Sequence, residues 1–270
     1  LHRTIGQLSS GLRINSASDD AAGMAVRENM RAQRGGMAQA SRNASEAVAM
    51  LQVAESGLAS IGDIFTRMRE LAVQAASDSI SDTERTFLNT EFQALDDEHD
   101  RISQATEYNG IRVLSGGAGD AFISDNGANA VPGYNAGSEF SRFTFQIGTR
   151  NDQNNQITVS IGSGSQADVD PATIATQADA QNAIDTMDTA IELNNRGRVR
   201  VGSPIRRLHA VIDNLAAATM NYDNAISQVA DTDMAEATAH FSKQQVLQQA
   251  GVAMLAQANQ QPNMVLRLLG

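Results

Sequence analysis

The chain has 270 residues, 41% of them hydrophobic, which is enough to build a sizeable core in one or two domains. Its net charge of −11 argues against nucleic acid as the main partner, because phosphate binding needs a concentrated positive field. The absence of cysteine excludes disulfides and thiolate sites, and 4% aromatic residues favour thin helix packing over a thick globular core.

The N-terminal residues 1–12 carry a helical pattern, and the polar stretch 16–20 supplies capping residues for the next helix. The chain begins at Leu1 rather than Met, already within this pattern. We therefore expect that an N-terminal part of this first helix is missing. No positively charged start followed by an apolar run is present, so no cleaved signal peptide is predicted.

A long helix is predicted over 21–76, because small and apolar residues recur alternately three and four places apart. A helix of this length would span roughly 80 Å, so it must lie along partners. Gly35 and Gly36 predict a bend at most, since each glycine costs about 1 kcal/mol relative to alanine. The residues of this heptad seam are Met30, Met37, Ala40, Ala44, Ala47, Leu51, Ala54, Leu58, Ile61, Phe65, Met68, Ala72 and Ala75.

A second helix is predicted over 82–106, and it is followed by turn residues from Asn109 and Gly110 onward. Two segments of alternating polarity, 143–147 and 157–161, predict a β-hairpin with one buried face. The residues that the second helix places on one face are Leu88, Phe92, Leu95, His99 and Ile102.

The helical pattern resumes after Pro171, and Gly202, Ser203 and Pro204 predict a break, with a fresh helix opening at Pro204. A second heptad seam follows. We expect this C-terminal helix to fold back antiparallel to the first, with the helix over 82–106 as the third member. The residues of the second seam are Leu208, Val211, Leu215, Ala218, Tyr222, Ala225 and Val229.

The resulting fold class is mainly α: a long antiparallel, coiled-coil-like bundle of helical rods with a small β-hairpin region and a short exposed insert. The chain is predicted to divide into seven parts. They are the end of an inner helix with its joint (1–18), two rod helices (19–114), a variable insert (115–140), a hairpin (141–162), a variable turn (163–172), the C-terminal rod (173–230) and a C-terminal inner helix (231–270).

The C-terminal stretch 244–266 has no charged residue in 23 positions, which is long enough to raise the possibility of a membrane span. Its seven glutamines and Pro262 make insertion into hydrocarbon costly. An apolar stripe beside many amides suits burial inside a protein assembly, where the amides find hydrogen-bond partners. We expect that form of burial rather than membrane insertion.

No enzyme chemistry is predicted. The histidines His2, His99, His209 and His240 lack ligand spacing, so neither a metal nor a cofactor is expected, and His99 suits a packed or carboxylate-paired role. The glycine cluster over 116–119 predicts a turn rather than a phosphate loop. The carboxylates over 96–100 predict a solvated helix face rather than a cation site.

One concentrated basic group stands out against the acidic total. Nucleic acid is one interpretation, but an intersubunit or surface role against an acidic partner fits the net charge better. Its members are Arg196, Arg198, Arg200, Arg206 and Arg207.

Motifs over most of the chain resemble those of bacterial flagellin; they leave out roughly 115–140 and 162–173. The N-terminal motifs are LSSGLRINS (8–16), DDAAG (19–23), QASRNA (39–44), RMRELAVQAA (67–76) and YNG (108–110). The later ones are FQIG (145–148), LQQAG (247–251), LAQAN (255–259) and VL (265–266). The sequence departs from the family at His99, where an aliphatic residue is usual, and at Pro204, in a helix that is normally continuous.

This resemblance implies a non-enzymatic subunit that self-assembles into the bacterial flagellar filament for motility. It also implies export through the flagellar secretion channel to the cell surface, with an export chaperone, a filament cap and other flagellin subunits as partners. The residues expected to serve polymerisation are Leu247, Ala250, Met254, Leu255 and Val265. Because the chain starts inside the family's first helix, we expect that this chain alone does not form native filaments.

Two alternatives remain open from the sequence. One is a hook–filament junction protein, which has similar helical ends. The other is a surface protein that binds glycans on a flagellin scaffold, through the amide-rich loop 148–156 or the short insert.

The resemblance also implies a recognition surface. Arg67, Leu71 and Glu91 match positions through which the flagellin-sensing Toll-like receptor of animals recognises this family. Arg67 and Leu71 are four residues apart, so we expect them to share one helix face that is left for a neighbouring subunit or a receptor.

Overall fold

The computed structural model describes residues 2–114, 140–162 and 173–269, without the side chains of His2, Phe140, Ser141 and 259–269. Its α-helices within these ranges are α1 (His2–Ser10), α2 (Ala21–Ala75), α3 (Asp82–Ala105), α4 (Gln177–Ala230) and α5 (Met234–Leu269). The strands are β1 (Glu107–Tyr108), β2 (Ile111–Arg112), β3 (Phe140–Gln146) and β4 (Gln156–Gly162), with a short 3-10 helix η1 (Gln153–Asn155). The mainly α fold class is thereby confirmed.

The chain divides into two compact units. Unit 1 comprises 1–36 and 217–270, and unit 2 comprises 37–216, so that α2 and α4 each contribute to both. The division passes through α2 directly after Gly36. The glycine cluster over 116–119, nearly all of the expected insert and the variable turn over 163–172 lie outside the described residues.

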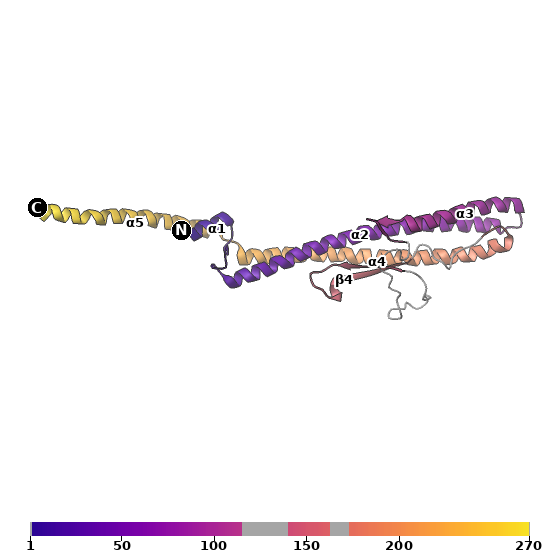
Figure 1. Cartoon of the computed structure of the whole chain (residues 1–270), viewed down its shortest axis with the longest axis horizontal. Coiled ribbons are helices and arrows are strands. Elements are labelled where there is room, and N and C mark those ends of the chain that lie inside the picture. The colour runs from indigo at the N-terminus through magenta and orange to yellow at the C-terminus, as the bar shows by residue number, and fades with distance from the viewer. Residues whose placement is uncertain (1, 115–139, 163–172, 270) are drawn as a thin grey trace. The chain divides into compact units, whose positions relative to one another are not determined.

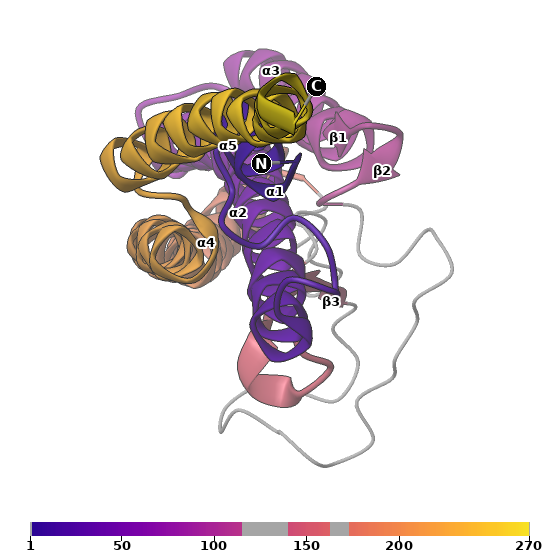
Figure 2. The same ribbon diagram turned by 90° about the vertical axis from the view of Figure 1, so that its left-hand side faces the viewer.

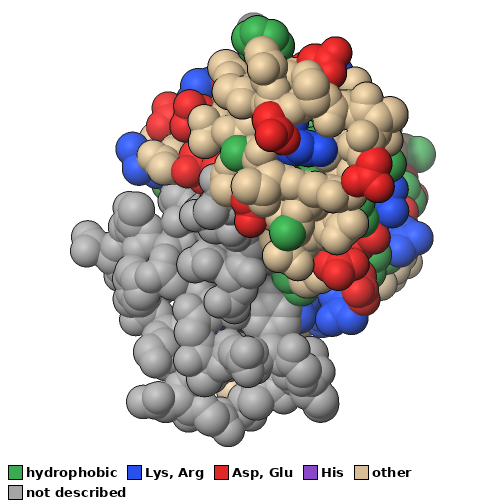
Figure 3. All heavy atoms as spheres, turned by 90° about the vertical axis from the view of Figure 1, so that its right-hand side faces the viewer, with side chains coloured by type: hydrophobic (Ala, Val, Ile, Leu, Met, Phe, Trp, Pro, Cys, Tyr) green, Lys and Arg blue, Asp and Glu red, His purple; other side chains and the backbone are tan. Residues whose placement is uncertain are grey.

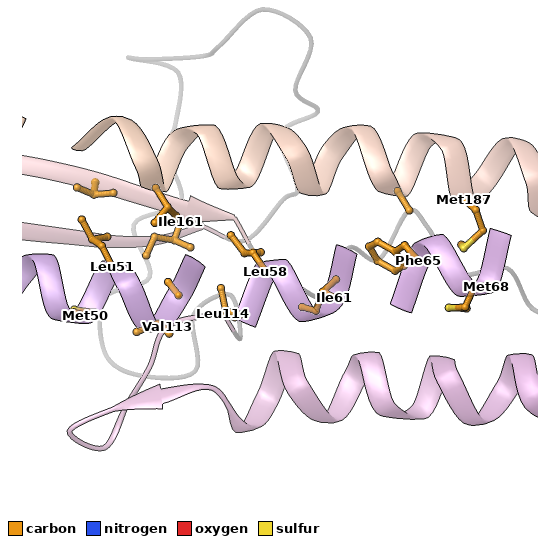
Figure 4. Packing of buried hydrophobic residues seen from close by; sticks show 14 of the residues in the cluster. Met50, Leu51, Leu58, Ile61, Phe65, Met68, Val113, Leu114, Ile161 and Met187 are labelled. Atoms are coloured by element: carbon orange, nitrogen blue, oxygen red, sulfur yellow. The ribbon is translucent and has the colours of Figure 1, made fainter. Parts of the chain in front are cut away.

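In unit 2, α3 and α4 each run antiparallel to α2 (Figure 1). Phe65 of α2 contacts His99 of α3, with ring centroids 4.9 Å apart, and the later residue Arg67 pairs with the earlier Glu91. On the other partner, Asn194 donates to the carbonyl oxygen of Leu58 at 3.0 Å. In Figure 4, Phe65 of α2 lies on the side of the helix that faces Met187 of α4.

The predicted heptad seam of α2 is confirmed from Ala40 to Ala75, where all of its residues are buried, while Met37 at the start of unit 2 is half-buried. Val48, Met50, Gly57 and Leu71 are buried as well, outside the seam. These extra positions are covered because α2 contacts the β-hairpin and the segment after β2 in addition to its two helical partners (Figure 4). Gly57 marks a close approach of the segment after β2: a Cβ there would meet Leu114 Cδ1 at 2.6 Å.

The turn between α2 and α3 is held by one buried arginine. Ser81 and Glu84 form a capping box at the start of α3. Arg85 is 6% exposed, and its Nε donates to the carbonyl oxygen of Ala75 at 2.8 Å, which satisfies a terminal carbonyl of α2. Its Nη1 pairs with Asp82 at 2.7 Å. The turn is therefore fixed by the ends of both helices.

Strands β3 and β4 form the predicted antiparallel hairpin, with Phe143 opposite Val159. Its buried face is made by Ile157, Val159 and Ile161, as the alternation predicts. Asn43 of α2 donates to the carbonyl oxygen of Gln146 at 3.1 Å and so fastens the end of β3 to the helix.

The predicted helix break at Pro204 is wrong. α4 runs without interruption from Gln177 to Ala230 with Pro204 inside it. Val201 and Leu208, on either side of the proline, are both 0% exposed. Tertiary packing on both sides of Pro204 therefore outweighs the loss of one backbone hydrogen bond and the ring's clash with the preceding turn.

In unit 1, α1 lies beside the start of α5 (Figure 2). Thr4 of α1 is buried, and its hydroxyl donates to Gln244 Oε1 at 3.3 Å. The joint after α1 pairs with the joint before α5: Thr232 N donates to the carbonyl oxygen of Gly11 at 2.9 Å, beside a β-bridge between Leu12 and Asp231. Asp20 caps α2 as expected, accepting from Gly23 N at 2.9 Å.

Candidate assembly and recognition surfaces

The first candidate surface is the apolar side of α5. Leu247, Met254 and Leu255 are 60%, 70% and 66% exposed, and Ala250 is exposed as well. Val246 and Val252 are each 64% exposed. Val265 also belongs to α5, but its side chain lies outside the described part of the chain. Large apolar side chains exposed together along an uncharged stretch of a helix are typical of an interaction surface.

Other faces of the molecule differ from this one. The end of unit 2 where α2 passes into α3 carries acidic and basic side chains interspersed with separate hydrophobic ones (Figure 3).

Among the described residues, α2 is the helix that is long and apolar enough to cross a membrane, and 44% of its most apolar stretch is buried in the fold. The apolar stretch of α2 therefore serves the core.

The second candidate surface centres on Arg67. Its Nη2 and Nε lie 2.7 Å and 3.0 Å from Glu91 Oε1, and its Nη1 lies 3.1 Å from Glu70 Oε2. The hydrogen bonds to Glu91, and then those to Glu70, raise the pKa of Arg67 above its ordinary value. Half of the Arg67 side chain stays exposed, so a fixed positive charge between two carboxylates is accessible to a partner.

The expectation that Leu71 shares this accessible face is wrong. Leu71 is 1% exposed and belongs to the core of unit 2. Four residues advance a helix by more than one full turn, so Leu71 is rotated from Arg67 toward α2's covered side. The long side chain of Arg67 also extends beyond the edge of the contact between α2 and α3, and the shorter side chain of Leu71 cannot do so. Arg67 and Glu91 are the accessible members of the predicted set.

The basic group lies on α4. Arg196 pairs with Glu192 at 2.5 Å, and Arg200 is half-buried. Arg198, Arg206 and Arg207 are exposed.

Within the described ranges, no group of three or more potential metal ligands occurs. His99 is buried against Phe65, which confirms the packed role, and its Nδ1 lies 3.4 Å from Asp100 Oδ1. His209 is exposed, and His240 lies 3.7 Å from Glu236.

Sequence reasoning missed Asn194, which is 4% exposed between α2 and α4. Its Nδ2 donates to the Leu58 carbonyl oxygen, whereas its Oδ1 is buried without a hydrogen-bond partner among the described residues. A Cβ on Gly62 would lie only 2.8 Å from that Nδ2, so the glycine makes room for the amide. The available signal was the spacing of Asn194 within the apolar repeat of α4, formed by Met187, Ala190, Val201 and Leu208.

Long antiparallel helices together with a largely exposed apolar stretch of α5 are typical of a protein that assembles with other chains. A family model of the bacterial flagellin N-terminal helical region matches residues 1–118, and one of the flagellin C-terminal helical region matches residues 184–269. The chain belongs to the bacterial flagellin family.

Named relatives agree along the whole chain. Flagellin FlaB2 of Treponema pallidum is 37% identical over 275 residues, covering 100% of this chain and 92% of the relative. The flagellin of Bacillus subtilis is 38% identical over 293 residues, covering 99% and 92%. A solved Vibrio parahaemolyticus chain described as a putative flagellar hook-associated protein is 18% identical and covers 79% of this chain and 100% of its own, with a TM-score of 0.62. That last likeness concerns the fold alone.

Proposed function

We propose that this chain is a structural subunit of the bacterial flagellar filament, which polymerises with copies of itself on the cell surface. The observation that carries the proposal is the match of both flagellin helical regions, with relatives named flagellin over the full chain. The exposed apolar side of α5 supports it, since a subunit needs a surface that only its neighbours cover.

Filament growth tests this function directly. The complete gene, expressed in a motile bacterium that lacks its own flagellin, is expected to restore filaments visible by negative-stain electron microscopy and to restore swimming. An empty vector is the control. Secreted but permanently monomeric protein would contradict the proposal.

The finer expectations concern export. Family membership supports secretion through the flagellar channel without a cleaved signal, and a bound export chaperone that shields the apolar side of α5 before release. It also supports insertion of each new subunit beneath a filament cap. The exposed Leu247 and Leu255 are the side chains that such a chaperone would cover.

The two alternatives are not favoured. The likeness to the hook-associated chain, at 18% identity, speaks for the fold and not for a junction role. The loop that was a candidate for glycan binding uses part of its polar groups internally: Gln146 Nε2 donates to the carbonyl oxygens of Gly148 and Arg150, each at 2.8 Å.

We further propose that Arg67 and Glu91 contact the flagellin-sensing Toll-like receptor of animals when the protein is monomeric. The charge of Arg67 is held in place by two carboxylates, which lowers the cost of ordering it in a complex.

Replacing Arg67 by alanine is expected to raise the concentration that gives half-maximal receptor signalling by about tenfold or more, since buried interface arginines are common hot spots. A reporter cell line measures it. Arg101→Ala is the matched control, because Arg101 forms a similar exposed pair with Glu98 on α3. Full signalling by Arg67→Ala would refute the proposal that Arg67 contacts the receptor. Leu71→Ala is not a test, because its side chain is buried in the core.

A further inference from the structure

We infer that the outer face of α4 in one subunit docks against the outer face of α3 in a neighbouring copy, through opposite charges. This inference rests on the proposed function and names two surfaces that meet in the polymer. It is carried by an exposed basic surface without internal ion-pair partners in the described part of the chain and by a complementary acidic surface elsewhere on the same unit.

The basic surface is formed by Val199, Arg206 and Arg207 of α4. No carboxylate occurs in the sequence from 193 to 212, whereas five arginines do. Across the residues that the structure describes, Arg206 and Arg207 make no ion pair, although both are exposed. Val199 is 67% exposed, and at 3.6 residues per turn it lies on the same side of the helix as Arg206. Arginine beside an exposed apolar side chain is typical of a contact surface.

The acidic surface is formed by Asp97 and Asp100 of α3. The two residues are three apart, so they share one helix face, and this face is turned away from the buried Phe92. Asp97 is exposed, and the side chain of Asp100 is 55% exposed beside its contact with His99. Glu98 pairs with Arg101 at 2.7 Å, whereas the exposed Asp97 makes no ion pair among the described residues.

The two surfaces cannot meet within one subunit, because α3 and α4 lie on different sides of α2 in this region (Figure 4). Opposite charges on separate faces are what a head-to-tail contact requires, and such a contact yields an open polymer when its rotation does not close a ring. A net charge of −11 makes identical subunits repel at long range, so local complementarity is needed for close approach.

The contacts also predict how neighbours are offset. His99 of α3 lies level with Phe65 of α2, and Asn194 of α4 lies level with Leu58. Arg206 lies a further twelve residues along α4. With a rise of 1.5 Å per residue, parallel neighbours that join Arg206 to Asp97 must be staggered by about 30 Å along the helix axis.

Charge reversal in both directions tests this docking. One full-length variant carries Arg206→Glu and Arg207→Glu, and the other carries Asp97→Arg and Asp100→Arg. Each variant alone then presents two surfaces of like charge, so its critical concentration for assembly is expected to rise by about tenfold or more over wild type. In a mixture each variant offers the other a complementary surface on both sides. Mixed filaments are therefore expected to form near the wild-type concentration.

Pelleting by ultracentrifugation measures the polymer, and circular dichroism confirms that each variant is folded. Arg31→Glu, which reverses an exposed arginine of α2 in unit 1, controls for net charge. Wild-type assembly is expected to weaken as salt rises from about 0.05 to 0.5 M, since the screening length shortens to a few Å. Wild-type assembly with unimpaired variants, or with variants that fail to rescue each other, would overturn the docking and leave the proposed function standing. Failure of the wild-type protein expressed from the complete gene to assemble would overturn both.

Discussion

Replacing Leu247 and Leu255 of α5 by glutamine is expected to raise the critical concentration for filament growth steeply while leaving the subunit folded. Both side chains are more than half exposed in the single chain, so their loss removes little from its own core. In a polymer the same side chains would be buried by neighbours. Glutamine keeps the length and helix propensity of leucine, and α5 already carries many glutamines, so the helix itself is preserved.

The expected size of the effect follows from burial. Each fully buried leucine contributes about 1.5–3 kcal/mol, and a glutamine at the same place leaves its amide to be satisfied. Two substitutions therefore cost about 3 kcal/mol or more per subunit added, which raises the critical concentration by about a hundredfold. Sedimentation of polymer across a protein dilution series measures this.

The control places the same chemistry on another part of the molecule. Val26 and Met220 are exposed apolar residues outside α5, and the double variant Val26→Gln, Met220→Gln is expected to assemble more readily than the α5 variant. Thermal unfolding should be unchanged in both variants. Filaments of the α5 variant at the wild-type critical concentration would show that this side of α5 is not the polymerisation surface.

The helices were largely predictable from sequence because their seams repeat. Apolar residues at alternating spacings of three and four fix one face of a helix, and a run of them from Ala40 to Ala75 is buried as expected. The capping residues Asp20 and Ser81 also indicate where α2 and α3 begin. At these positions the local sequence pattern and the tertiary packing favour the same structure, so the sequence pattern is enough to predict the helix.

The misses occur where a residue's environment depends on several partners at once. A heptad seam predicts which side of α2 packs against one helix, but other elements contact α2 on further sides. Leu71 is therefore buried, although its spacing from Arg67 suggested a shared outer face. Pro204 disfavours helix locally, and only the packing of Val201 and Leu208 shows why α4 continues. The accessible part of the recognition surface therefore required the structure.

Asn194 illustrates a different kind of miss, since its type conflicts with its position. It sits in an apolar repeat and forms one hydrogen bond across the interface, to the Leu58 carbonyl oxygen, in a space left by Gly62. Buried amides at such positions are known to specify helix register at a cost in stability. In α4 the bond pairs Asn194 with one turn of α2, and a shift by a turn would leave the amide unpaired.

Converting Asn194 to aspartate is expected to lower the free energy of unfolding at pH 7 by about 3 kcal/mol or more. The substitution removes the Nδ2 donor, places a carboxylate against the Leu58 carbonyl oxygen and buries a charge without a partner. Asn195→Asp is the matched control, because the neighbouring side chain is exposed, and its effect should stay within about 0.5 kcal/mol.

The pH dependence separates buried charge from simple loss of packing. Burial raises the pKa of the carboxyl introduced by Asn194→Asp above the ordinary value of about 3.9 that it has in the unfolded chain. Above the folded-state pKa the ionised carboxylate destabilises the variant, and as pH falls through that pKa the carboxyl becomes neutral and the deficit shrinks. Urea unfolding of the variant and wild type at pH 7 and pH 5 measures the difference at each pH. A deficit that is equal at both pH values, or equal to that of Asn195→Asp, would show that no charge is buried at this helix contact.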